Sequence, residues 1–196
     1  MELKTKRFLL RDFIDADIAA FETYHNDQRS REFYGTEEST PEHARELITL
    51  FKAWAEAQPR VNYQLAIIQR GAPQALIGCC GVRCANSEPG TGELGIELAP
   101  EYWGRYAYAN EVMLALAEFG FNTLGLQMIY GETVSANSRV ARLVSSIGAT
   151  AIIRPTPAWM ASKGWTQVEW QITRQQWESV RRTLRSSGPP SAAGEL

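Results

Sequence analysis

Residues 92–123 read GELGIELAPEYWGRYAYANEVMLALAEFGFNT, and the rest of the chain is organised around them. From Gly92 to Leu98, apolar residues alternate with polar or small ones, which is typical of a strand with one buried face. Pro100 ends that strand, and apolar residues recur at helical spacing from Val112 to Phe119. A helix therefore begins just after a strand ends. Its unpaired first-turn amides and its dipole make this junction a natural site for an anion such as a phosphate.

Junctions of this kind are common in α/β proteins and most bind nothing, so composition and the other motifs must decide what this one does. At 196 residues and 44% apolar composition, the chain suits one packed domain, which we expect over residues 1–185. Residues 186–196, SSGPPSAAGEL, are expected to form a disordered tail. A net charge of -2 favours neither DNA nor a membrane as partner, although Arg105, Arg139 and Arg142 could serve a small phosphorylated ligand.

The cysteines and histidines bear on the compartment and on metal binding. Cys79, Cys80 and Cys84 lack the paired CxxC spacing of a zinc site, so we expect reduced thiols that pack in the core of a cytoplasmic protein. No apolar run reaches the roughly 18 residues of a membrane span, and the N-terminus is too polar for a signal peptide. His25 and His43 have no metal-ligand spacing, so we expect packing or surface roles and no metal.

Strands and helices follow from apolar periodicity, capping residues and turn residues along the chain. The Pro-rich segment 155–164 reads as a loop, and its Trp159 is a candidate for the wall of an acceptor site. Expected strands span residues 4–13, 63–69, 76–84, 92–98, 127–134, 149–154 and 166–173. Expected helices span residues 15–24, 41–55, 105–119, 137–147 and 173–185.

Five segments form a spaced pattern: RFLLRDF (7–13) with Asp17, LIGCCGVR (76–83), GELGIELAPEYWGRYAYANEV (92–112), ETVSANSRVARLVSSIGA (132–149) and TRQQW (173–177). In this order and spacing they resemble the GCN5-related N-acetyltransferases (GNAT), and within these the RimJ/RimL-like branch that acetylates ribosomal-protein N-termini. The resemblance extends to about Trp177. It implies an α/β (α+β) fold with helices on both faces of a mixed, mostly antiparallel sheet. That sheet splays open after its fourth strand, where a bulge leaves backbone groups unpaired.

The resemblance also implies acetyl-CoA as cofactor. Main-chain groups of the strand from Gly95 would hydrogen-bond the pantetheine arm, and Ile96, Leu98 and Ala99 are the candidates there. The turn and first helical residues would hold the pyrophosphate: Gly104, Arg105, Tyr106, Ala107, Tyr108 and Ala109. We expect the guanidinium of Arg105 to pair with a phosphate. Asn137 matches the position that contacts the pantetheine, and Arg142 is a further cofactor candidate.

Two positions depart from the family pattern. Ala107 stands where a glycine is usual, and alanine disfavours positive φ, so the loop needs right-handed helical angles there or binds the pyrophosphate less tightly. Val140 stands where the family often has a serine that is proposed to protonate the leaving thiolate. Tyr106, Tyr108 and Ser138 remain as alternative donors for that proton.

Acetyl transfer needs a neutral amine, a donor for the developing oxyanion and a base. Glu93 and Glu97, on the polar face of the central strand, are the candidate bases, with an ordinary solvated strand face as the alternative for each. The amide near Leu98 is the candidate oxyanion donor.

The expected activity is acetylation of a primary amine, most of all a protein N-terminal α-amine, for which we expect an open acidic groove. A small amine such as an amino sugar, amino acid or antibiotic is the alternative acceptor, because this fold changes acceptor by changing its loops. An acyl-CoA-binding regulatory module without catalysis, prompted by Ala107 and Val140, is the alternative of another class. Helix faces bearing Tyr and Trp leave a homodimer open.

Overall fold

The computed structural model describes residues 1–33, 41–71 and 75–186, and the fold is built on a sheet that runs through these ranges. Eight strands among the described residues follow the order β1-β2-β3-β4-β5-β6-β8-β7. Neighbours are antiparallel except for β5 and β6, which are parallel. The strands are β1 (Glu2–Lys4), β2 (Phe8–Arg11), β3 (Asn62–Gln69), β4 (Ala75–Arg83), β5 (Thr91–Leu98), β6 (Met128–Val134), β7 (Thr150–Arg154) and β8 (Gln167–Thr173).

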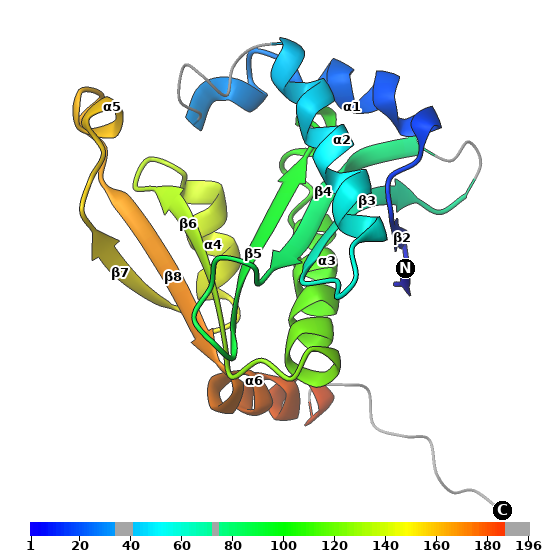
Figure 1. Ribbon diagram of the computed structural model, residues 1–196. Coiled ribbons are helices and arrows are strands. Elements are labelled where there is room, and N and C mark those ends of the chain that lie inside the picture. The colour runs from blue at the N-terminus through cyan, green and yellow to red at the C-terminus, as the bar shows by residue number, and fades with distance from the viewer. Residues whose placement is uncertain (34–40, 72–74, 187–196) are drawn as a thin grey trace, which may run out of the picture.

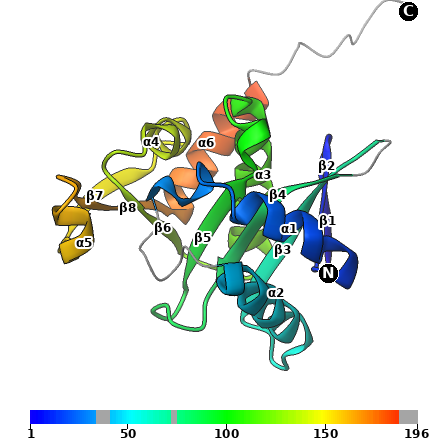
Figure 2. The same ribbon diagram turned by 90° about the horizontal axis from the view of Figure 1, so that it is seen from above.

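Helices cover both faces of this sheet, as the view from above shows (Figure 2). Helices α1 and α2 lie on one face over a core that includes Phe21 and Phe51, whereas α3, α4 and α6 lie on the other over a core that includes Leu116 and Ile172. The helices are α1 (Ile18–His25), α2 (Pro41–Glu56), α3 (Tyr106–Glu118), α4 (Ser138–Ser145), α5 (Ala158–Ala161) and α6 (Arg174–Ser186). Short 3-10 turns are η1 (Asp15–Asp17), η2 (Ser30–Phe33) and η4 (Pro100–Tyr102), and a π-helical turn, η5 (Phe119–Thr123), continues α3.

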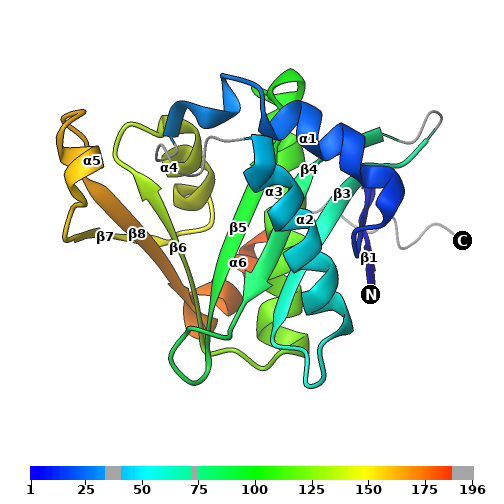
Figure 3. The same ribbon diagram turned by 45° about the horizontal axis from the view of Figure 1, so that its top comes forward.

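The sheet opens between its two parallel strands. Strands β5 and β6 are paired only where residues 91–93 face residues 128–130, and each strand continues beyond that point. In Figures 1 and 3 the two strands lie side by side at their start and then diverge, with β8 and β7 following β6. The predicted splayed sheet is therefore confirmed. The opening follows β5 rather than the fourth strand because the expected first strand is divided in two.

Two packed residues mark the base of this opening. Gly131 of β6 lies opposite Trp170 of β8 in the ladder, and the indole of Trp170 covers the Gly131 backbone. A Cβ at Gly131 would lie 2.5 Å from Trp170 Cζ2 and 2.8 Å from the Leu94 carbonyl oxygen of β5. Only glycine leaves room for a buried indole between the strands at this point.

Two local expectations are corrected by the structure, and a third concerns residues that it mostly does not describe. The single strand expected at 4–13 is replaced by a hairpin of β1 and β2, because the chain turns at Thr5. The Thr5 N–H donates to the Phe8 carbonyl at 2.9 Å, and the Phe8 N–H donates to the Thr5 hydroxyl at 3.0 Å. The loop at 155–164 contains the one-turn helix α5. The expected tail, apart from Ser186 at the end of α6, lies outside the described residues.

The resemblance implied a bulge at the opening, but the bulge that is observed lies in β4, where it pairs with β3. The register between β3 and β4 shifts so that Ile77 has no partner, and the Ile77 carbonyl accepts the Ala99 N–H at 2.8 Å. All three cysteines are free thiols. No helix within the described ranges is both long and apolar enough to cross a membrane.

Candidate active site

The unpaired part of β5 directs backbone groups into the opening. The Ala99 amide bonds β4, and alternate residues of a strand direct their amides to opposite neighbours. Leu94, Ile96 and Leu98 therefore turn their backbone groups toward the side on which β6 has departed. The Leu98 carbonyl already accepts the indole N–H of Trp103 at 2.8 Å. The remaining groups, above all the N–H of Ile96 and of Leu98, can hydrogen-bond an extended amide-containing ligand.

The turn after β5 presents an anion site beside this edge. Gly104 has φ +79°, and the chain then enters α3 at Tyr106, so the first-turn amides of α3 point out of the helix end. The Arg105 guanidinium stays at this helix end. It donates to the Tyr108 hydroxyl at 3.3 Å and stacks over the rings of Tyr102 and Tyr108 at 5.4 and 5.5 Å. Backbone donors and one positive charge thus converge where a phosphate would bind.

Ala107 does not disturb this cradle. It lies inside α3, and no non-glycine residue among those described has positive φ. Its carbonyl accepts a bond from Arg7 at 3.0 Å, and Arg7 also pairs with Glu111 at 2.7 Å, which fixes the first turns of α3 against the start of β2. The first alternative derived from the sequence, right-handed helical angles at this position, is the one observed. Positive φ is needed at Gly104 instead.

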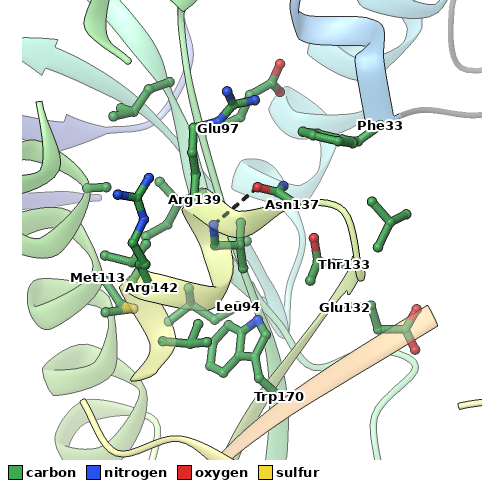
Figure 4. A pocket seen from close by; sticks show the side chains of 18 of the residues that line it. Phe33, Leu94, Glu97, Met113, Glu132, Thr133, Asn137, Arg139, Arg142 and Trp170 are labelled. Atoms are coloured by element: carbon green, nitrogen blue, oxygen red, sulfur yellow. Dashed lines mark hydrogen bonds between the residues drawn. The ribbon is translucent and has the colours of Figure 1, made fainter. Parts of the chain in front are cut away.

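The opposite wall of the opening is the start of α4. The Asn137 side chain accepts the Val140 N–H at 3.2 Å and so caps this helix (Figure 4). Arg142 is exposed one turn further on and bonds the Ser138 carbonyl at 3.4 Å. Arg139 lies 4.1 Å over the Trp103 ring and pairs with Glu32 at 3.5 Å, which ties η2 to both walls.

These walls enclose a pocket of about 940 Å³. Figure 4 shows Trp170 and Leu94 at one end of it, and Glu97 and Phe33 at the other. Nine of the residues expected from the sequence line it: Glu93, Ile96, Glu97, Leu98, Gly104, Arg105, Ala109, Asn137 and Arg142. Val140 lines it as well, and so does Trp159, as expected for a wall residue.

Five other residues that the sequence analysis proposed for the site have different positions or contacts. Ala99 donates its amide to β4, and neither Ala99 nor Ala107 lines the pocket. The Tyr108 ring packs edge-on against Phe8 at 5.0 Å, and Ser138 is exposed at the first position of α4, so neither hydroxyl lines the pocket. Tyr106 begins α3, and its side chain lies outside what the structure describes.

The two candidate bases have different surroundings. Glu93 forms an ion pair with Arg83 at 2.8 Å, and Arg83 also donates to Gln64 at 2.9 Å. The Arg83 guanidinium lies over Gly95, where a Cβ would approach its Nη2 to 3.0 Å. Glu93 is thus neutralised by an arginine that packs closely over the glycine of β5. The negative charge of Glu93 is therefore balanced by the Arg83 guanidinium.

The contacts of Glu97 are instead with His25 and Cys79. Its side chain is 22% exposed, and one carboxylate oxygen lies 3.6 Å from Nδ1 of the buried His25. The thiol of Cys79 donates to the other oxygen at 3.9 Å, because burial, reinforced by the charge of Glu97, raises the pKa of Cys79 to about 12 and keeps the sulfur protonated. Glu97 therefore offers a carboxylate at the pocket wall, on the face of β5 that α1 and α2 only partly cover.

Sequence reasoning missed several residues that shape the pocket. Arg83 and His25 act on the two glutamates from other elements, and η2 contributes Phe33 and Ser30 to the lining. A cationic residue on the neighbouring strand, or a histidine on a helix, carries no local signal of such a contact. Only the register of β4 against β5 brings Arg83 opposite Glu93.

The open strand edge, the helix end with its arginine and the adjacent carboxylate together define an acyl-CoA-dependent acyltransferase site. An extended pantetheine arm fits the free amides of β5, and a pyrophosphate fits the start of α3. The chain belongs to the GNAT acetyltransferase family: residues 7–150 match the family described as "Acetyltransferase (GNAT) domain". Enzymes of this family use acetyl-CoA, as the resemblance implied.

Known proteins agree with this assignment. The uncharacterised N-acetyltransferase YoaA of Bacillus subtilis is 31% identical over 148 residues, which cover 74% of this chain and 81% of YoaA. The ribosomal-protein-S5-alanine acetyltransferase of Vibrio fischeri has TM-score 0.69 at 14% identity, covering 90% of this chain and 98% of that one. Spermidine N-acetyltransferase of Vibrio cholerae, solved with CoA and spermine, has TM-score 0.68 at 15% identity, covering 89% of this chain and 99% of that one. At these identities the two structures bear on the fold alone.

Proposed function

We propose that this acetyltransferase modifies the N-terminal α-amine of a protein, as the RimJ/RimL-like branch does. The fold shared with the ribosomal-protein-S5-alanine acetyltransferase is compatible with this acceptor, but the same fold also serves spermidine. The choice between them must therefore rest on the charges of the pocket.

The observation that carries the proposal is that one pocket carboxylate remains without a strong partner. Of the three glutamates in the lining, Glu93 is neutralised by Arg83, and Glu132 accepts a bond from Gln167 at 2.8 Å near its exposed end. Glu97 is left for an incoming ammonium group. Four arginines line the same pocket, so its lining is not the acidic one expected for a peptide acceptor. A polyamine or aminoglycoside carries several positive charges that this lining would repel, whereas a peptide N-terminus carries one.

The described residues support each step of a direct transfer. Acetyl-CoA, when bound, supplies the thioester carbonyl that the amine attacks. An α-amine has a pKa of about 8, so a useful fraction is already neutral near pH 7, and Glu97 takes the proton that the nitrogen loses. The Leu98 N–H is available to the developing oxyanion, a contribution of about 3 kcal/mol in comparable sites. The C–N bond forms first, and collapse of the resulting oxyanion breaks the C–S bond. CoA leaves as a thiolate that takes up one proton from water, which balances the proton that the nitrogen passes to Glu97.

The test is an acceptor screen with purified protein and acetyl-CoA. N-terminal hexapeptides with a free α-amine are compared with the same peptides blocked at the N-terminus and carrying a lysine, and with spermidine and glucosamine. Mass spectrometry locates the acetyl group. Acetylation at the free α-amine alone supports the proposal, and turnover confined to the small amines overturns it.

A matched pair of variants links that activity to the site. Glu97→Gln keeps the size of the side chain and should lower kcat roughly 100-fold, the usual contribution of a positioned base. Glu101→Gln removes a 63% exposed carboxylate that pairs with Arg29 outside the pocket, and it should leave kcat unchanged. Equal losses in the two variants would remove Glu97 from the reaction.

Two further parts of the proposal concern compartment and assembly. The three free thiols support a reducing compartment, and we propose the cytoplasm.

A homodimer is supported by the edge strand β7, on which Ile153 is 66% exposed. Light scattering of the wild type and of Ile153→Lys measures this directly, and a monomeric wild type would reject it.

A further inference from the structure

We infer that His25 is the proton-accepting partner of Glu97, so that the base of the reaction is a carboxylate–imidazole pair rather than a carboxylate alone. This inference rests on the proposed function and adds a positioning residue to it. It comes from a part of the chain that has no place in the cofactor cradle: the last residue of α1.

Burial and orientation set His25 apart from a packing residue. Its side chain is only 4% exposed, and its ring stacks on Phe21 with centroids 5.2 Å apart and planes within 11°. This stack holds the ring with Nδ1 3.6 Å from Glu97. The separation is longer than a hydrogen bond, and contacts of this kind commonly tighten when substrates bind. A residue needed only to fill space against Phe21 would require no ring nitrogen at that position.

The residues around Glu97 and His25 come from four elements, and several of them can donate or accept a proton. Glu97 faces His25 from β5, Cys79 contacts Glu97 from β4 as a protonated thiol, and Tyr24 precedes His25 on α1. From α2, the half-buried His43 lies with its ring centroid 5.8 Å from that of His25. Both histidines of the chain therefore belong to the helices that cover the α1 and α2 face of the sheet.

The proton balance of the reaction gives this arrangement a role. One proton must leave the attacking nitrogen for each acetyl group transferred, and Glu97 receives it. Glu97 must lose that proton before the next turnover, and only 22% of its side chain is exposed. The Nδ1 atom of His25 accepts it, and the proton passes on to solvent by way of the half-buried His43, whose ring centroid lies 5.8 Å from that of His25. Imidazole is suited to this exchange because its charge changes within the physiological pH range.

The first test compares two variants of the same stack. His25→Phe keeps a ring against Phe21 but has no nitrogen, and we expect kcat to fall about tenfold or more with the KM for acetyl-CoA unchanged. The acidic limb of its kcat–pH profile should also change shape. Phe21→Leu weakens the packing but keeps the imidazole, and it should retain the wild-type pH profile. Exogenous imidazole should restore activity to His25→Ala.

The outcomes separate the two proposals. A wild type that acetylates no amine overturns the proposed function and this inference with it. An active wild type whose kcat and pH profile survive His25→Phe overturns the inference alone. If His25→Phe lowers the melting temperature, as Phe21→Leu does, and changes nothing else, His25 acts by packing alone. That result also overturns the inference and leaves the proposed function in place.

A second measurement does not depend on turnover. The chain has two histidines, so the imidazole carbon–proton signals of labelled protein are simple, and His43→Asn assigns them. At one fixed pH, the His25 signal should lie at a different chemical shift in Glu97→Gln than in the wild type, because the variant removes a carboxylate 3.6 Å from Nδ1. The His43 signal, which is further from Glu97, should move less. A His25 signal that is indifferent to Glu97→Gln refutes the pair.

Discussion

Replacing Gly131 by alanine tests whether the opening between β5 and β6 depends on a missing side chain. The added Cβ would lie 2.5 and 2.6 Å from two indole atoms of Trp170 and 2.8 Å from the Leu94 carbonyl oxygen. Trp170 is 4% exposed and the carbonyl belongs to the backbone, so neither can withdraw easily. Overpacking of this kind costs about 1–3 kcal/mol, and we expect the upper end. For a chain of this size, about 3 kcal/mol corresponds to a fall in melting temperature of roughly 6–12 °C.

Differential scanning calorimetry measures that fall, and Gly120→Ala is its control. At Gly120 a Cβ would also meet an atom at 2.8 Å, but that atom is the terminal methyl of Ile129, which can rotate away. We expect the control to cost less than about 1 kcal/mol. In a Trp170→Leu background the cost of Gly131→Ala should fall by about half, since the Leu94 clash remains. Equal effects at the two glycines, or no coupling to Trp170, would refute the steric reasoning.

Three other perturbations address the cofactor cradle, a helix cap and an ion pair. Arg105→Ala should weaken acetyl-CoA binding about tenfold, equivalent to roughly 1.4 kcal/mol, and so reduce the rise in melting temperature that acetyl-CoA produces. Asn137→Ala should lose the cap of α4, about 1 kcal/mol or roughly 2–4 °C, whereas Asn137→Asp should keep it, both measured by calorimetry. The Arg154 guanidinium lowers the pKa of Glu169, so the pair stabilises the fold above the usual carboxyl pKa and ceases to do so as pH falls through the lowered value. Arg154→Gln should therefore lower the melting temperature near pH 7 and differ less from the wild type near pH 3, and a constant difference would contradict this.

Much of the fold was predictable because its signals are local. Alternation in β5 and helical spacing in α3 place both elements within a residue or two of their observed ends. The misses have equally local causes. The single turn of α5 is too short to establish a period, and the apolar cluster Phe8–Leu10 conceals the turn at Thr5 that separates β1 from β2.

The site was predictable on its cofactor side and not on its acceptor side. The cofactor side is one continuous segment, from β5 through the turn to α3, so its residues are neighbours in sequence as well as in space. The partners of the two glutamates come from elsewhere, Arg83 from β4 and His25 from α1. Periodicity placed Glu93 and Glu97 on the same strand face and could not rank them as bases. The distances to Arg83 and His25 provide that ranking.

The interrupted pairing of β5 also has a consequence for amide hydrogen exchange. In the part of β5 beyond Glu93, the amides of Gly95 and Glu97 are tied to β4, while those of Ile96 and Leu98 face the opening. Slow and fast exchange should therefore alternate from one residue to the next within a single strand, a period of two that ordinary fraying does not produce. Saturating CoA should slow only the fast set, which makes these two amides residue-specific reporters of whether the pantetheine arm is in place.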